Sequence, residues 1–166
     1  MLLDDNPYKG ILYCGLMITE EGPKVVEYNC RLGDPEAQAV LPSLESDLLD
    51  LMDAAVNEQL NSREIKIDDK YRCCVVMASD GYPLEYQKGK EITGIDDIDD
   101  ALVFHAGTKT EDGKIYSDGG RVLSVVGAGD SLKDSIKNTY SEVKKIDFEN
   151  KYFRSDIGTK GLKYIS

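Results

Sequence analysis

Apolar residues near the amino terminus predict a hairpin. Residues 11–19 form a nearly continuous apolar run, which is typical of a strand that is buried on both faces. Turn-forming residues follow at positions 20–23, and residues 24–29 form the predicted returning strand. We therefore expect an enclosed strand that pairs with its successor along the chain.

A helix is expected after the polar stretch at residues 31–36. Ser46 or Asp47 is placed to cap its first turn. The apolar residues that fall on one face of this helix are Leu48, Leu51, Met52, Ala55 and Val56. The pattern fades at residues 60–62, so we expect one domain at residues 1–62 and a second at residues 63–166.

The second domain combines strands with a closing helix. Buried strands are predicted at residues 72–78, 101–107 and 121–126, and turn residues at 81–83 end the first of them. Ser131 and Asp134 form the pattern of a helix capping box. We expect Leu132, Ile136, Tyr140 and Val143 on the inward face of this helix, with Lys144 and Lys145 in its last turn. The chain as a whole is therefore expected to have an α+β fold.

Charge and composition narrow the functional classes. The 166 residues carry a net charge of −11, which argues against nonspecific binding to nucleic acid or to an anionic membrane. No apolar run approaches the length of a membrane-spanning helix, and the amino terminus lacks the pattern of a signal peptide. We expect a cytoplasmic, reducing location. The four cysteines form no C-x-x-C pair and are predicted to be buried thiols: Cys14, Cys30, Cys73 and Cys74.

The densest group of chemically useful side chains is Glu27, Asn29 and Arg31. Residues two apart in a strand point the same way, so Glu27 and Asn29 leave one face together. A carboxylate beside an amide oxygen suits Mg²⁺ shared with substrate phosphates, and a guanidinium suits a phosphate or acyl-phosphate oxygen. An exposed hairpin face with a Glu–Arg surface pair is the alternative, and the spacing alone does not choose between them.

These motifs are colinear with those of a known family. GILYCGLM at residues 10–17 and GPKVVEYNCRLGDPEAQ at residues 22–38 are similar to the last part of the ATP-grasp domain of glycinamide ribonucleotide synthetases. The similarity continues through residues 46–48, 78–83, 104–108, 119–123 and 153–158. It implies the end of an ATP-grasp domain followed by a small mixed α/β C-terminal domain.

The resemblance also implies an activity and roles for particular residues. The family joins glycine to 5-phosphoribosylamine, with ATP forming a glycyl phosphate. On this basis Glu27 and Asn29 are expected to bind Mg²⁺ or Mn²⁺, and Arg31 to lie near the transferred phosphoryl group. Asp34 and Glu36 are candidates to orient an amine substrate or to pair with Arg31.

Arg121 is a further candidate, because Gly119 and Gly120 before it can present backbone N–H groups to a substrate phosphate. The alternative is a tight turn into a strand. Many ATP-grasp enzymes carry a second metal-binding acid on the preceding strand, where this chain has Cys14, Gly15 and Leu16. The number of metal ions therefore stays open.

The resemblance implies substrates and partner domains, and alternative interpretations remain beside it. It implies ATP, glycine, 5-phosphoribosylamine and upstream domains of the same polypeptide, which carry the adenine contacts and the phosphate loop. We therefore expect the 166 residues alone to be an inactive fragment. The rival interpretations are another ATP-grasp carboxylate–amine ligase, a purine-pathway carboxylase, and a non-catalytic module that binds a nucleotide or a partner.

Overall fold

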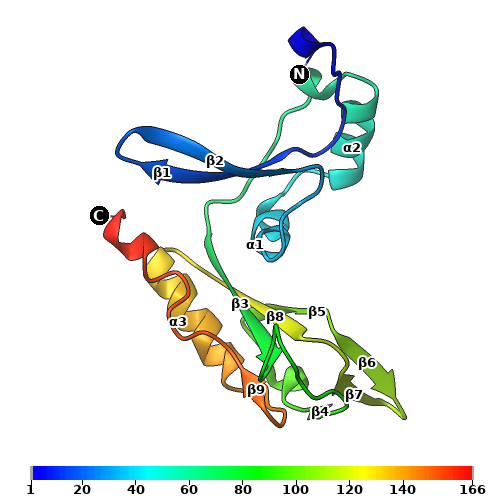
Figure 1. Cartoon of the computed structure of the whole chain (residues 1–166), viewed down its shortest axis with the longest axis vertical. Coiled ribbons are helices and arrows are strands. Elements are labelled where there is room, and N and C mark those ends of the chain that lie inside the picture. Colours follow the sequence, from blue (N-terminus) through cyan, green and yellow to red (C-terminus); the bar gives the residue numbers. More distant parts are fainter. Residues whose placement is uncertain (1, 166) are drawn as a thin grey trace. The chain divides into compact units, whose positions relative to one another are not determined.

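A computed structural model describes residues 2–165 of the chain, which form two compact units. The first unit ends at Asp68 and the second begins at Asp69. Both contain helices and strands (Figure 1), so the expected α+β fold is confirmed.

The first unit is built from a hairpin and short helices. Its elements are the 3-10 helix η1 (Leu2–Asp4), strands β1 (Tyr13–Thr19) and β2 (Gly22–Asn29), helix α1 (Glu36–Val40), 3-10 helix η2 (Leu41–Ser43), helix α2 (Leu48–Val56) and 3-10 helix η3 (Leu60–Ser62). Strands β1 and β2 pair antiparallel, with Tyr13 opposite Asn29 and Gly15 opposite Glu27. An irregularity in the register follows Gly15.

The first strand is not enclosed by the described residues of its own unit, although its apolar run is typical of a strand that is buried on both faces. Ile18 is 76% exposed and Met17 58% exposed on β1, and Val26 on β2 is 66% exposed. Among the hydrophobic residues described in the first unit, only Ala54 is fully buried. The strand forms because its residues favour extended structure, but no described element of its own unit covers its apolar side chains.

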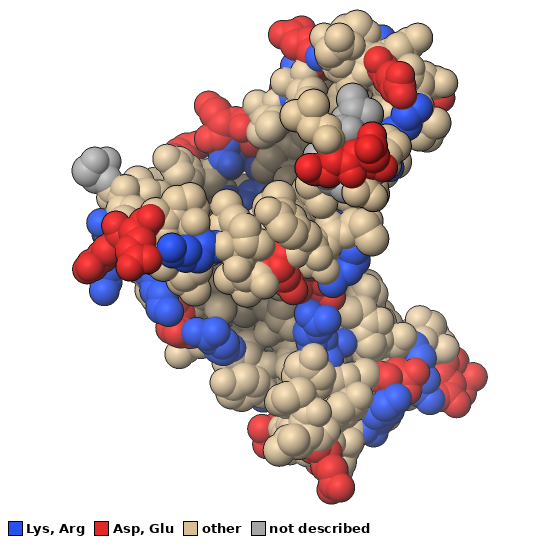
Figure 2. All heavy atoms as spheres, turned by 45° about the horizontal axis from the view of Figure 1, so that its top comes forward, with Lys and Arg blue, Asp and Glu red and all other residues tan. Residues whose placement is uncertain are grey.

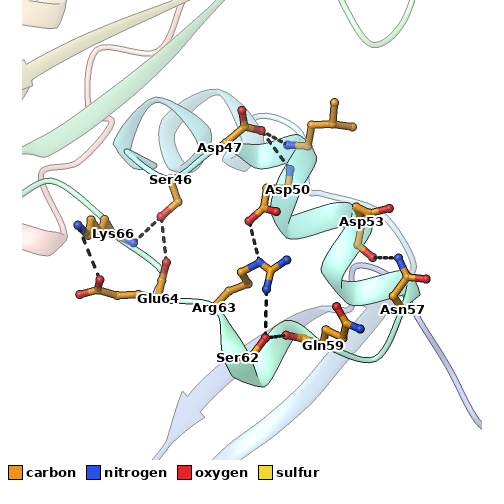
Figure 3. A network of polar contacts seen from close by, with 11 residues as sticks. Ser46, Asp47, Asp50, Asp53, Asn57, Gln59, Ser62, Arg63, Glu64 and Lys66 are labelled. Atoms are coloured by element: carbon orange, nitrogen blue, oxygen red, sulfur yellow. Dashed lines mark hydrogen bonds and ion pairs between the residues drawn. The ribbon is translucent and has the colours of Figure 1, made fainter.

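Helix α2 begins with the predicted cap, and a residue beyond its end folds back to contact it. The Asp47 carboxylate accepts hydrogen bonds from the backbone N–H groups of Leu49 and Asp50, at 2.8 and 3.1 Å. Arg63 returns to the helix, with its Nε atom 2.9 Å from Asp50 Oδ2 (Figure 3). This contact ties the residues after η3 back to α2.

The segment after Arg63 stays with the first unit. Lys66 donates its backbone N–H to Ser46 Oγ at 2.8 Å, and Ile67 forms a β-bridge with Leu44 (the Ser46 contact is drawn in Figure 3). The backbone N–H of Asp68 donates to the Ser43 carbonyl at 2.9 Å. Compactness therefore divides the chain after Asp68, whereas the functional domain boundary near residue 62 stays a prediction.

The second unit contains two antiparallel sheets and a long helix. One sheet has the order β5-β8-β3-β9 and the other β4-β7-β6. The elements are β3 (Tyr71–Ser79), β4 (Glu91–Ile92), 3-10 helix η4 (Ile95–Asp97), β5 (Ala101–His105), β6 (Thr108–Glu111), β7 (Lys114–Ser117), β8 (Arg121–Gly129), α3 (Leu132–Val143), β9 (Lys151–Tyr152) and 3-10 helix η5 (Gly161–Lys163). The three predicted strands correspond to β3, β5 and β8.

The hydrophobic core lies where α3 packs on β3 and β8. Val75, Met77, Leu123 and Val125 are fully buried in it, and Val143 reaches it from the helix. The buried face of α3 also contains polar residues that the sequence analysis left out: Ser135, Thr139 and Glu142. The helix ends at Val143, so Lys144 is its C-cap residue and Lys145 lies outside the last turn in which both were expected.

The predicted capping box at the start of α3 is present. Ser131 Oγ accepts the backbone N–H of Asp134 at 3.1 Å and donates to the Asp134 carboxylate at 2.6 Å. Ser131 therefore caps the helix as the spacing predicts, while the Asp134 carboxylate contacts the Ser131 hydroxyl rather than its backbone N–H.

The expectation of buried cysteines is half right. Cys73 is buried and Cys74 half-buried in β3, but Cys14 and Cys30 are exposed. Burial raises the pKa of the Cys73 thiol, and a hydrogen bond involving Thr139 opposes that shift. No helix among residues 2–165 is long and apolar enough to cross a membrane.

Candidate functional site

The two predicted metal ligands meet on one face of the hairpin. The Asn29 side-chain amide donates to Glu27 Oε1 at 2.9 Å, as their spacing on an extended strand predicts. Gly15 lies opposite Glu27, and a Cβ atom at position 15 would approach Glu27 Cγ to 3.0 Å. The absence of a side chain at Gly15 therefore leaves room for the Glu27 side chain to lie across the strand pair.

The loop after β2 brings Glu36 toward this face. Tyr13 donates its hydroxyl hydrogen to Glu36 Oε1, with the two oxygens 3.2 Å apart. Tyr13 is also the cross-strand partner of Asn29. Asp34 accepts a hydrogen bond from the Gln38 side chain at 3.0 Å. Glu36 and Asp34 therefore contact Tyr13 and Gln38, and their role toward an amine substrate or Arg31 stays a prediction.

Arg31 lies just beyond β2, which ends at Asn29. Its guanidinium donates to the Leu32 carbonyl at 3.0 Å, and its side chain is exposed. The strand therefore does not persist far enough to carry Arg31 as a third residue of its face. Arg31 is instead held by the loop that leads to α1.

Tyr13 is the member of this group that the sequence analysis missed. The negative charge of Glu36 is the main cause that raises the pKa of the Tyr13 hydroxyl, followed by lost hydration, the hydrogen bond and the charge of Glu27. Both carboxylates therefore act on the same phenol. The sequence could have pointed to Tyr13, because a tyrosine at the start of an apolar strand brings one polar atom to the hairpin face.

The donor set fits a divalent cation of the Mg²⁺ type. Glu27 and Asn29 offer a carboxylate and an amide oxygen on one face, and hard cations prefer such oxygen ligands. Among residues 2–165 there is no group of three or more His, Cys, Asp or Glu side chains arranged to hold a metal ion. Any cation here would therefore take its remaining ligands from substrate or water, as Mg²⁺ usually does.

Arg121 belongs to the second unit, at the first position of β8. The glycine pair before it is engaged through its carbonyl groups: Ser79 Oγ donates to Gly119 O at 3.0 Å, and the Ser79 backbone N–H donates to Gly120 O at 2.8 Å. The Tyr82 ring packs directly over Gly120. These contacts hold the glycine pair in a tight turn at the start of β8, and the phosphate-binding role of Arg121 stays a prediction.

The basic side chains of the second unit are often paired with acids. Lys90 lies 2.8 Å from Glu149, and Lys114 lies 2.9 Å from Glu91. Figure 2 shows Lys and Arg side chains interspersed with Asp and Glu over the face that it presents.

Comparison with known proteins identifies the class and then the family. Residues 1–37 match the ATP-grasp (A) domain of phosphoribosylglycinamide synthetase, which places the hairpin and its Glu27–Asn29 pair in an ATP-grasp domain. Residues 72–160 match the C domain of the same enzyme. The chain belongs to the phosphoribosylglycinamide synthetase family.

Curated relatives agree with this assignment. The chain is 50% identical to phosphoribosylamine–glycine ligase of Caldanaerobacter subterraneus over 90% of this chain and 36% of that protein. It is 45% identical to the trifunctional purine biosynthetic protein adenosine-3 of Gallus gallus over 96% of this chain and 16% of that protein.

A crystal structure of phosphoribosylamine–glycine ligase from Thermotoga maritima resembles the chain with a TM-score of 0.68. The sequence identity is 35%, over 87% of this chain and 36% of that one. The chain therefore spans little more than a third of the length of the single-activity relatives it matches.

Proposed function

We propose that this sequence is part of an ATP-dependent ligase that joins glycine to 5-phosphoribosylamine, releasing ADP and phosphate, in purine biosynthesis. The observation that carries the proposal is the hydrogen-bonded Glu27–Asn29 pair on the hairpin of a chain from this family. The joining of glycine to phosphoribosylamine is taken from the name of the Caldanaerobacter relative, and the purine pathway from the name of the Gallus gallus relative. The use of ATP and the glycyl phosphate intermediate come from the family resemblance.

In this proposal Glu27 and Asn29 hold a divalent cation, either Mg²⁺ or Mn²⁺. Such a cation, when bound, neutralises charge on the phosphates of ATP. Arg31 presents a guanidinium to the oxygen atoms that become negatively charged during transfer. Its position two residues beyond Asn29, where β2 ends, leaves the guanidinium exposed.

The remaining candidates recognise the substrates. Glu36 and Asp34 offer carboxylates to the amino group of glycine or of the ribosylamine, and Arg121 offers a guanidinium to the substrate phosphate. Residues 1–62 complete the ATP-grasp domain in this proposal, and residues 63–166 form the C-terminal domain. The adenine contacts come from upstream domains of the same polypeptide.

The test is the substrate dependence of ADP release by a full-length polypeptide that carries this sequence. We expect ADP release to require glycine and 5-phosphoribosylamine together. Residues 1–166 alone, assayed in parallel, are expected to release none, because Glu27, Asn29 and Arg31 supply only part of the groups that must converge on ATP. Calorimetric titration of this shorter chain with Mg-ATP checks the same point.

Two outcomes would replace the proposal. Activity with bicarbonate or another carboxylate in place of glycine would indicate a different ATP-grasp ligase or carboxylase. Binding of nucleotide without any ADP release by the full-length polypeptide would indicate a non-catalytic module.

A further inference from the structure

Tyr13 connects two parts of the hairpin unit that the sequence separates. It starts β1, lies opposite Asn29, and reaches Glu36 at the first position of α1 with its hydroxyl. The contact spans 23 residues of sequence. The Tyr13 side chain therefore joins the strand pair to the start of α1.

The position of the Glu36 carboxylate depends on this contact. Glu36 is exposed, so packing does not fix its rotamer. Its carboxylate folds back over Gly33, where a Cβ atom would lie 2.5 Å from Glu36 Oε2. Glu36 Oε2 thus lies against the Gly33 backbone, where there is no side chain, and Glu36 Oε1 accepts a hydrogen bond from the Tyr13 hydroxyl. Among the described residues, no lysine or arginine forms an ion pair with Glu36.

We propose that Tyr13 is a positioning residue, whose hydroxyl holds the Glu36 carboxylate beside the Glu27–Asn29 pair to receive the ammonium group of a small amino acid. The inference rests on the proposed function and adds to it a residue that sets substrate recognition. An amino acid whose carboxylate reacts near the metal ligands presents its ammonium group a few atoms away. A carboxylate fixed by Tyr13 on the same face meets that requirement.

The Tyr13→Phe variant of the full-length polypeptide isolates the hydroxyl. We expect the KM for glycine to rise about tenfold, because a hydrogen bond to a charged group is lost, while the KM for ATP stays within about twofold. Binding of Mn²⁺ to the free protein, followed by electron paramagnetic resonance, should not change. Tyr28→Phe is the matched control, because Tyr28 lies on the same hairpin between Glu27 and Asn29 and faces the other way.

A double-mutant cycle with Glu36→Gln tests whether Tyr13 acts through Glu36. We expect Tyr13→Phe to have little further effect on the KM for glycine once Glu36 is changed. An equal rise in both backgrounds, or a Tyr13→Phe protein that behaves like Tyr28→Phe, overturns the positioning role. If unmodified protein releases ADP without glycine, the proposed function fails and this inference fails with it. Glycine dependence with an unaltered Tyr13→Phe protein rejects this inference alone.

Discussion

Single side chains decide whether the hairpin face can hold a cation. Asn29 already donates one hydrogen bond to Glu27, which fixes the amide so that its oxygen points away from the carboxylate it contacts. To share one cation with the Glu27 carboxylate, the Asn29 amide has to turn its oxygen toward it, which replaces this hydrogen bond with a metal contact. The value of the pair as a cation site depends on the Glu27 charge, because an amide alone is a weak ligand for a hard cation.

We therefore expect Glu27→Ala, in the full-length polypeptide, to weaken Mn²⁺ or Mg²⁺ binding at least about tenfold, by comparison with losses of supporting residues around metal sites. Turnover should fall while the circular dichroism spectrum stays unchanged, because Glu27 is exposed. The measurement is a metal titration of the free protein together with the metal dependence of ADP release.

Glu20→Ala is the control for this change, because Glu20 is an exposed acid in the turn of the same hairpin. It alters the net charge equally and should leave the titration unchanged. Equal metal affinity of the Glu27→Ala and unmodified proteins would return the pair to the role of a surface hairpin contact.

At the scale of elements, α3 shows how a helix with polar residues can be buried. Thr139 is fully buried, and its hydroxyl accepts the Gly127 backbone N–H at 3.1 Å. The same oxygen lies 2.7 Å from the Ser135 carbonyl and 3.0 Å from the Cys73 carbonyl. One hydroxyl therefore joins α3 to β8 and β3.

The Thr139→Val substitution tests this junction with almost no change in shape. We expect the free energy of unfolding of the second unit to fall by about 1–3 kcal/mol, because buried polar groups of the sheet lose their partner. Urea denaturation followed by circular dichroism measures the change. Thr110→Val, at an exposed position of β6, should shift the free energy by less than about 0.5 kcal/mol. Equal urea denaturation midpoints for the Thr139→Val and Thr110→Val proteins would contradict the role given to Thr139.

The elements differ in how far the sequence could predict them. Strands β3 and β8 followed from their apolar runs, and α3 from its capping box, because each carries a local signal. The hairpin of β6 and β7 was missed although Asp112 and Gly113 form its turn, with φ angles of 50° and 77°. This pair is typical of a two-residue hairpin turn. The two-residue strands β4 and β9 are too short to give any periodic pattern.

Tertiary contacts account for the other differences. The buried face of α3 includes Ser135 and Glu142, whose burial depends on partners elsewhere in the chain, such as the Asp99 N–H that donates to Glu142 at 3.1 Å. A pattern of apolar residues cannot show such contacts. The Tyr13–Glu36 contact is of the same kind, whereas the Glu27–Asn29 contact follows from strand geometry alone.

At the scale of the whole molecule, the two units differ in how much apolar surface they enclose. The hydrophobic cluster formed by residues such as Val75, Leu123 and Ile146 lies entirely in the second unit. The first unit buries Ala54 alone among its described hydrophobic residues. Burial of apolar surface is the main stabilising contribution to folding, so the units should differ in local stability.

Hydrogen–deuterium exchange of the 166-residue chain should reveal this difference. We expect the amides of β3 and β8 to exchange slowly, near the rate set by global unfolding, and those of β1 and β2 to exchange much faster. Mass spectrometry of peptic fragments gives both rates in one experiment. Comparable protection in β1 and β8 would show that the apolar side chains of the hairpin are buried against another segment or another copy of the chain. The oligomeric state of the sample should then be measured.

The positions of the site residues along the chain restrict where insertions and deletions can occur in related sequences. Tyr13, Glu27, Asn29 and Glu36 all fall within one short stretch, and the hairpin turn lies between the first two. Extra codons at the turn would lengthen the loop and leave the strand pairing intact. One extra codon between Glu27 and Asn29 would put the two side chains on opposite faces. Natural insertions and deletions in this stretch should therefore be confined to the turn.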